Sequence, residues 1–173
     1  MLLNIPPHAL VLLVGVAGSG KSTFAGKHFK STEIVSSDAL RAAVSDDPAD
    51  QSASADAFGL LRLITVMRLR RGRLTVIDAT SVQRESRRGL LRLAAKNGKP
   101  AVAIVLNLPL ETCLARLQAR TDRAVAPEVA EKQAADLRSS LPGLTEEGYA
   151  AVYVMDNAED IDSAQVLRDA SPL

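Results

Sequence analysis

Short apolar runs alternate along the chain with segments whose apolar residues recur at helical spacing. The runs are nearly continuous, which is the pattern of strands buried on both faces of a parallel sheet. Apolar residues at i, i+3, i+4 and i+7 predict helices whose stripes enter the core. Strands that alternate with helices predict a three-layer α/β fold with a five-stranded parallel sheet. The predicted strands are Ala9 to Val14, Glu33 to Ser36, Leu74 to Asp78, Ala101 to Asn107 and Ala151 to Met155.

Local signals place the helices and loops between these strands. Asn97 and Gly98 end a helix that begins near Arg84, and Pro109 opens the next one. We expect one domain over residues 1–173, with residues 1–8 as a short tail, and leave open that it is the N-terminal module of a longer protein. The two helical stripes expected in the core are Leu60, Leu63, Ile64 and Met67, and Leu110, Cys113, Leu114 and Leu117.

Composition narrows the class of protein. The chain is 47% hydrophobic and 24% charged but only 3% aromatic, with no tryptophan, so its core must be aliphatic. Cys113 is the single cysteine, which excludes an intramolecular disulfide and a cysteine zinc cluster and favours a reducing compartment. No stretch approaches the ~20 apolar residues of a membrane span. We therefore expect a cytoplasmic protein with no membrane partner.

The net charge of +1 hides an uneven distribution of charge along the chain. The segment from Arg62 to Lys99 is rich in arginine and lysine and contains only Asp78 and Glu85 as acids. The segment from Thr145 to Asp169 is acidic. Solvated helix faces and a nucleic-acid track both explain such a basic region, and the sequence does not choose between them.

A phosphate-binding motif follows the first predicted strand. Residues Gly15 to Ser22 read Gly-Val-Ala-Gly-Ser-Gly-Lys-Ser, a full match to G-x-x-x-x-G-K-S, and a helical segment from Ser22 to Phe29 comes next. Backbone N–H groups of such a loop hold a polyphosphate at a helix N-terminus. The motif predicts that Lys21 reaches the β- and γ-phosphates of ATP or another nucleoside triphosphate, and that the Ser22 hydroxyl ligates Mg²⁺. Nucleotide contacts are expected from Gly15, Gly18, Ser19, Gly20, Lys21, Ser22 and Thr23.

Two features favour phosphoryl transfer over hydrolysis. No Asn-Lys-x-Asp guanine signature occurs, and Ala79 follows Asp78 where many P-loop ATPases carry a glutamate that activates water. A kinase instead needs a base beside its acceptor, and Asp38 lies just past the predicted strand that ends at Ser36, at the edge of the sheet where ligands collect. Arg41 follows at i+3 and could hold an anionic group of the acceptor. Asp38 could equally serve as a helix cap, a role compatible with catalysis.

A third constellation contains three arginines. Arg116, Arg120 and Arg123 are spaced four and three residues apart, which predicts a stack along one side of a helix. Like charges in such a row repel unless an anion neutralises them. They fit a helical lid over residues 116–128 that folds onto the transferring phosphoryl group; the alternative is three solvated arginines, one of them paired with Asp122.

Several of these segments together resemble the polynucleotide 5′-kinase family, and within it the N-terminal kinase domain of bacterial polynucleotide kinase-phosphatases of RNA end-healing and sealing systems. The resemblance covers about Ala9 to Asp156. The segments that carry it are Gly-Ser-Gly-Lys-Ser-Thr-Phe-Ala, Val-Ser-Ser-Asp-Ala-Leu-Arg, Ser-Asp-Asp-Pro-Ala-Asp-Gln-Ser, Leu-Thr-Val-Ile-Asp-Ala-Thr and Arg-Thr-Asp-Arg, in the order of the family.

The resemblance implies a P-loop kinase fold and transfer of the γ-phosphate of ATP, with Mg²⁺, to the 5′-OH end of RNA or DNA. It implies Asp38 as general base, Arg41 as ligand of the acceptor phosphate, and Asp78 near the metal's water or the acceptor. The segment Asp78 to Ser81 has serine where the family has asparagine. Phosphatase and ligase domains or a partner methyltransferase would be its associates. The catalytic set is then Lys21, Asp38, Arg41, Arg120 and Arg123, with Arg116, Arg120 and Arg123 on the donor nucleotide.

Two other functions keep the same nucleotide site. A kinase of a small metabolite or antibiotic would retain Lys21 and Asp38 but needs a closed acceptor pocket. An ATP-dependent binding or regulatory module would tolerate the loss of Asp38.

Overall fold

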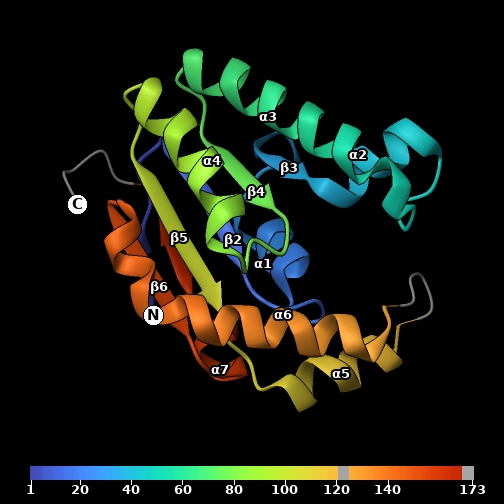
Figure 1. The fold of residues 1–173 in the computed structure, drawn as a ribbon. Coiled ribbons are helices and arrows are strands. Elements are labelled where there is room, and N and C mark those ends of the chain that lie inside the picture. The colour runs from blue at the N-terminus through green and yellow to red at the C-terminus, as the bar shows by residue number, and fades with distance from the viewer. Residues whose placement is uncertain (121–124, 169–173) are drawn as a thin grey trace.

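A five-stranded parallel sheet forms the centre of the molecule, in a computed structural model that describes residues 1–120 and 125–168 (Figure 1). The strand order is β3-β4-β2-β5-β6. Every strand predicted from the sequence is present, with ends that differ by at most one residue. The bounds are β2 Leu10–Val14, β3 Ile34–Ser36, β4 Thr75–Asp78, β5 Ala101–Leu106 and β6 Ala151–Met155.

The central strand β2 determines where the phosphate-binding loop lies. In the parallel register, Leu10 pairs with Thr75 of β4 on one side and with Ala101 of β5 on the other. All five residues of β2 are buried. Because β2 has neighbours on both sides, the loop that leaves its carboxyl end emerges at the middle of the sheet edge. The ends of β3 and β4 reach the same edge.

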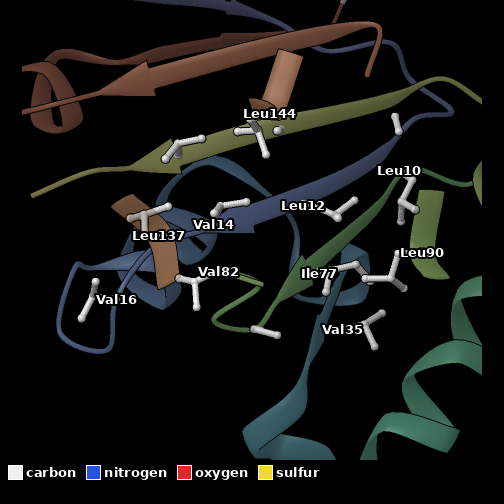
Figure 2. Packing of buried hydrophobic residues seen from close by; sticks show 14 of the residues in the cluster. Leu10, Leu12, Val14, Val16, Val35, Ile77, Val82, Leu90, Leu137 and Leu144 are labelled. Atoms are coloured by element: carbon white, nitrogen blue, oxygen red, sulfur yellow. The ribbon is translucent and has the colours of Figure 1, made fainter. Parts of the chain in front are cut away.

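Helices cover both faces of the sheet, which confirms the three-layer prediction (Figure 1). One apolar cluster joins the sheet to α3, α4 and α6, and Figure 2 shows Leu12 of β2 and Ile77 of β4 close to Leu90 of α4. A second cluster, with Phe24 and Phe29, packs α1 on the opposite face. The helices are α1 Lys21–His28, α2 Ser37–Ser45, α3 Ser54–Arg70, α4 Arg84–Lys96, α5 Leu110–Gln118, α6 Pro127–Ser140 and α7 Ala158–Ser163; 3₁₀ turns η1 Ser31–Glu33, η2 Gln51–Ala53 and η3 Leu141–Glu147 connect some of them.

Residues 1–8 do not form the short tail expected from the sequence. Strand β1 (Leu2–Asn4) pairs in parallel with β7 (Gln165–Leu167) as a separate two-stranded sheet. Leu3 and Ile5 are fully buried. The partner strand lies at the other end of the chain, so the local pattern of three residues gave no signal of this pairing.

Three of the four residues of the apolar stripe predicted as core on α3 face outward, so the prediction was wrong for them, whereas Ile64 packs against the core cluster. Leu60, Leu63 and Met67 are 36%, 51% and 51% exposed. The helix instead packs through the adjacent row Ala57, Leu61, Thr65 and Leu69, which is buried. Both rows have helical spacing, and α3 is so rich in apolar residues that periodicity alone does not choose between its faces.

The stripe predicted on α5 is confirmed. Cys113 and Leu117 are buried, and Leu110 and Leu114 pack against the same cluster. Across the part of the chain that the structure describes, no helix is both long enough and apolar enough to cross a membrane.

Candidate active site

A cleft of about 1650 Å³ opens at the carboxyl edge of the sheet. The phosphate-binding loop lies at its base, with α2 and α3 on one side and α5 and α6 on the other (Figure 1). Crevices at this edge are where open α/β sheets bind ligands. The cleft brings together most residues that were predicted from separate segments of the sequence. The predicted site residues among its lining are Gly18, Ser19, Gly20, Lys21, Ser22, Thr23, Asp38, Arg41, Asp78, Arg116 and Arg120.

Glycine is required at three positions of the loop for different reasons. Gly18 and Gly20 have φ of 83° and 98°, in the left-handed region that side chains disfavour. A Cβ on Gly18 would lie 2.5 Å from the carbonyl oxygen of Cys113 in α5. A Cβ on Gly15 would lie 2.8 Å from the carbonyl oxygen of Leu106. The loop therefore packs backbone to backbone against β5 and α5, which fixes the direction of its N–H groups.

Lys21 closes this loop from inside. Its buried Nζ donates hydrogen bonds to the carbonyl oxygens of Gly15 and Val16, at 2.9 and 2.8 Å. These bonds hold the ammonium group at the centre of the loop, where P-loop proteins bind the β- and γ-phosphates. The predicted contact of Lys21 with the β- and γ-phosphates stays a prediction.

Asp78 and Ser22 lie together beside the loop. Asp78 ends β4, next to the central strand, and is only 7% exposed. Burial raises the pKa of its carboxyl group, against the opposing effects of a hydrogen bond with Ser22 and the positive charge of Lys21. A hydroxyl and a carboxylate are hard oxygen donors of the kind that Mg²⁺ takes together with water and phosphate oxygens. These two residues fit a magnesium site.

Asp38 lies in the first turn of α2, whose N-cap is Ser36. Arg41, one turn later, donates from Nη2 to Asp38 Oδ1, so the two side chains lie on the same face of α2. Arg41 is buried, and its Nε donates to the carbonyl oxygen of Pro48 at 2.9 Å. Its guanidinium therefore anchors both the carboxylate and the loop after α2. The predicted contact of Arg41 with an acceptor phosphate stays a prediction.

The arginines of the predicted lid are arranged differently from a single helical stack. Helix α5 ends at Gln118, so Arg120 follows the helix instead of continuing it. Arg116 Nη1 lies 3.4 Å from the carbonyl oxygen of Ser19 in the phosphate-binding loop. Arg116 and Arg120 both line the cleft, while Arg123 lies outside the described residues.

Sequence reasoning missed the contribution of α6. The side-chain oxygen of Gln133 accepts a hydrogen bond from the N–H of Ala17 in the phosphate-binding loop, at 2.8 Å. Lys132 and Asp136 also line the cleft, and Gln83 donates to Asp136 at 2.9 Å. The i, i+1, i+4 spacing of these polar residues marked one face of a helix. It did not reveal that this face meets the phosphate-binding loop.

The loop after β4 is held by a buried arginine that the sequence placed only within a basic region. Arg87 is fully buried and forms an ion pair with Glu147, with Nε to Oε2 at 2.8 Å and Nη2 to Oε1 at 2.5 Å. Its Nη1 donates to the carbonyl oxygens of Ser81 and Val82, at 2.9 and 2.7 Å. Arg87 is thus part of the structural frame of the cleft and cannot contact a nucleic acid.

Comparison with known proteins defines the class and then the family. The fold is that of P-loop kinases: it superimposes with a TM-score of 0.69 on a chain of the Pnkp1/Rnl/Hen1 RNA repair complex, 23% identical over 82% of this chain and 47% of that one. The AvrRxo1-ORF1:AvrRxo1-ORF2 complex with ATP gives 0.69 at 16% identity, over 90% of this chain and 56% of that one. A gluconokinase from Sinorhizobium meliloti 1021 gives 0.55 at 18% identity, over 91% and 87%. Residues 10–144 match the AAA domain family AAA_33, and the chain belongs to this family of P-loop kinase domains.

A curated relative is much longer than this chain. Transcription factor bHLH140 from Arabidopsis thaliana is 29% identical over 161 residues, which are 90% of this chain and 17% of the relative. The chain thus spans less than a fifth of that protein's length and less than half of the matched chain in the RNA repair complex.

Proposed function

We propose that this chain is an ATP- and Mg²⁺-dependent polynucleotide kinase that transfers the γ-phosphate to the 5′-OH end of RNA or DNA. The observation that carries the proposal is the composition of the cleft. Lys21 and Ser22 lie at its base, Asp38 with Arg41 on the α2 side, and Arg116 with Arg120 on the α5 side. The donor phosphate and the acceptor hydroxyl would meet between the α2 side, where Asp38 would act on the acceptor, and the α5 side, where the arginines would bind the donor.

The reaction follows from these positions. Asp38 accepts the proton of the 5′-hydroxyl as its oxygen forms a bond to the γ-phosphorus, and the bond from that phosphorus to the bridging oxygen breaks. The electron pair leaves with ADP, and Asp38 afterwards releases its proton to water. Lys21 neutralises charge that develops on the phosphates, and Mg²⁺ held near Ser22 and Asp78 would supply further positive charge there.

Closure over the donor is the proposed role of the segment 116–128. Arg116 already contacts the phosphate-binding loop, and Arg120 lines the cleft beside it. Arginines brought onto the transferring group would stabilise its charge and exclude water, which prevents loss of the phosphoryl group to hydrolysis.

A kinase of a small metabolite is the second candidate, and one observation favours it. The gluconokinase from Sinorhizobium meliloti 1021 aligns over 87% of its own length, so a chain of this size and fold serves as a complete sugar kinase there. The cleft includes the nucleotide site as well as the acceptor side, so its volume is compatible with both candidates.

The test is phosphate transfer from γ-labelled ATP to matched RNA and DNA oligonucleotides with a 5′-hydroxyl, with gluconate and nucleosides as alternative acceptors. Transfer to the oligonucleotides is expected. Transfer to gluconate or a nucleoside without transfer to any oligonucleotide would refute the proposal and favour the second candidate.

Asp38→Ala tests the general base. We expect kcat to fall roughly 10²- to 10⁴-fold while ATP still binds, because Asp38 acts on the acceptor hydroxyl and not on the donor. Asp56→Ala removes an exposed carboxylate from the first turn of α3, outside the cleft lining, and is the matched control. Equal transfer activity of the two variants would exclude Asp38 as the general base, whereas ATP binding by the wild type without transfer to any acceptor would favour an ATP-dependent binding module.

A further inference from the structure

The three phenylalanines of the chain differ sharply in burial. Phe24 and Phe29 are 2% and 6% exposed, as expected for apolar residues that pack α1 on the sheet. Phe58 is 38% exposed, and it lines the cleft from α3. In a chain with so few aromatic residues, one of them lies open at the proposed acceptor site, and packing within the protein does not account for it.

Arg62 follows Phe58 by one turn of α3 and also lines the cleft. Its guanidinium lies near Gly89 of α4: Nη2 is 3.9 Å from the position that a Cβ atom on this glycine would occupy. Among the residues that the structure describes, Arg62 makes no hydrogen bond or ion pair, unlike Arg87, whose guanidinium is saturated by protein groups. Arg62 is therefore a cation available to a ligand in the cleft.

Phe58 and Arg62 form a continuous row with Ser54, at spacings of four residues, and all three line the cleft. Such a row lies along one side of a helix, with about 6 Å of rise between successive members. Helix α3 packs against α2, which carries Asp38 and Arg41. The other exposed apolar residues of α3, Leu60, Leu63 and Met67, are aliphatic and do not line the cleft.

We propose that Phe58 is a stacking platform for a nucleobase near the 5′ end of the acceptor strand and that Arg62 binds a backbone phosphate on the 3′ side of that base. This inference rests on the proposed polynucleotide kinase function and names the part of the site that distinguishes a nucleic acid from a sugar. Stacking on an aromatic ring accepts every base, and an arginine contact adds the phosphate charge that a sugar acceptor lacks.

The first experiment combines Phe58→Ala with acceptors that lack a base. KM and kcat are measured for a 5′-OH oligonucleotide and for versions with a single abasic site at the first, second or third nucleotide. Phe58→Ala should raise KM for the intact acceptor roughly tenfold to a hundredfold and leave KM for ATP unchanged. With the base removed at the stacked position, the same substitution should have no further effect.

Two further variants make the result specific. Phe58→Trp keeps a stacking surface and should retain a KM close to that of the wild type, whereas Leu63→Ala removes an exposed apolar side chain from the outer side of α3 and should change nothing. Equal KM values for wild type and Phe58→Ala would overturn the stacking role. So would an increase of the same size on the intact acceptor and on all three abasic acceptors.

The second experiment tests Arg62 through the effect of salt. Arg62→Gln should raise KM for the oligonucleotide and lower the slope of log KM against log salt concentration by about 0.7, the value of one phosphate contact on a single strand. Arg70→Gln on the same helix, outside the cleft lining, is the control. An unchanged slope would overturn the phosphate contact.

The two levels of proposal fail differently. Absence of transfer to any oligonucleotide by the wild-type protein would remove the proposed function and this inference together. Transfer by the wild type with no dependence on Phe58 and Arg62 would remove this inference alone.

Discussion

Two buried charged side chains lie on either side of the short loop that follows β4, and they are treated in opposite ways. Asp78 comes directly before the loop, and Arg87 follows it in α4. Arg87 is saturated by Glu147 and two loop carbonyl groups. Asp78 has a raised pKa, because burial outweighs the hydrogen bond with Ser22 and the positive charge of Lys21, which both lower it.

The difference distinguishes a buried charge that stabilises the fold from a buried charge that is suited to binding a cation. A buried ion pair whose hydrogen-bonding groups are all satisfied holds its surroundings in place. A buried carboxylate whose charged form is disfavoured gains when a cation arrives, so its electrostatic cost in the protein alone becomes affinity for a ligand. Arg87 holds the loop between them through the carbonyl groups of Ser81 and Val82.

Removing Arg87 should produce the largest loss of stability. Arg87→Met would leave the Glu147 carboxylate, with a side chain that is 4% exposed, buried without its partner. We expect the free energy of unfolding to fall by about 3–5 kcal/mol, measured by urea denaturation. The double variant Arg87→Met with Glu147→Leu should recover much of this loss, and Arg88→Met, at an exposed neighbouring position, should be nearly neutral. A neutral Arg87→Met would show that this pair does not hold the loop.

Asp78→Asn should reverse that pattern, with lower activity and higher stability. Loss of the carboxylate from the proposed magnesium site should lower kcat roughly 10- to 100-fold at fixed Mg²⁺. Burial raises the pKa of Asp78 above its ordinary value of 3.8. Between these two pKa values the folded protein still holds the proton that the unfolded chain has released. Wild-type stability should therefore decrease as pH rises through that folded pKa.

The asparagine variant should lack this decrease and melt at a higher temperature than the wild type at neutral pH without Mg²⁺. Melting curves collected from about pH 4 to pH 8 measure both effects, and Asp56→Asn on the surface provides the control for the loss of one negative charge. A variant that melts below the wild type at neutral pH would contradict the view that Asp78 carries an electrostatic cost.

The sequence predicted the sheet well because its strands are buried on both faces, so that each one is a continuous apolar run with clear ends. It failed where a choice depended on distant partners. β1 forms only because β7 lies beside it, and α3 has two apolar rows of which tertiary packing selects one. Local pattern contains no information about either choice.

The site follows the same division. Lys21, Ser22 and Asp38 were predicted because a contiguous motif or the end of a strand places them, and the structure gathers them in one cleft. Gln133 and Phe58 were missed, because each reaches the cleft through the packing of a helix whose own sequence looks ordinary. Arg87 shows the converse: a residue of a basic region proved to be buried, and only the ion pair with Glu147 reveals why.

The smallest expected effect concerns Ser81, which lies in the loop between the two buried charges. Its φ is 49°, a conformation that serine adopts at a cost and asparagine tolerates better. Its carbonyl oxygen accepts a hydrogen bond from Arg87, so this backbone geometry is part of the support of the loop.

Ser81→Asn should raise the free energy of unfolding by about 0.5 kcal/mol, and Ser81→Val should lower it by more, because a branched side chain suits a left-handed backbone poorly. Urea denaturation of the two variants and the wild type gives the order. With Arg87→Met as the background, Asn and Val at this position should differ much less, since the loop is then free to leave the strained conformation. An equally large difference in both backgrounds would mean that Arg87 does not impose the strained backbone at Ser81. The stabilising role of Arg87 would then be limited to its own ion pair with Glu147.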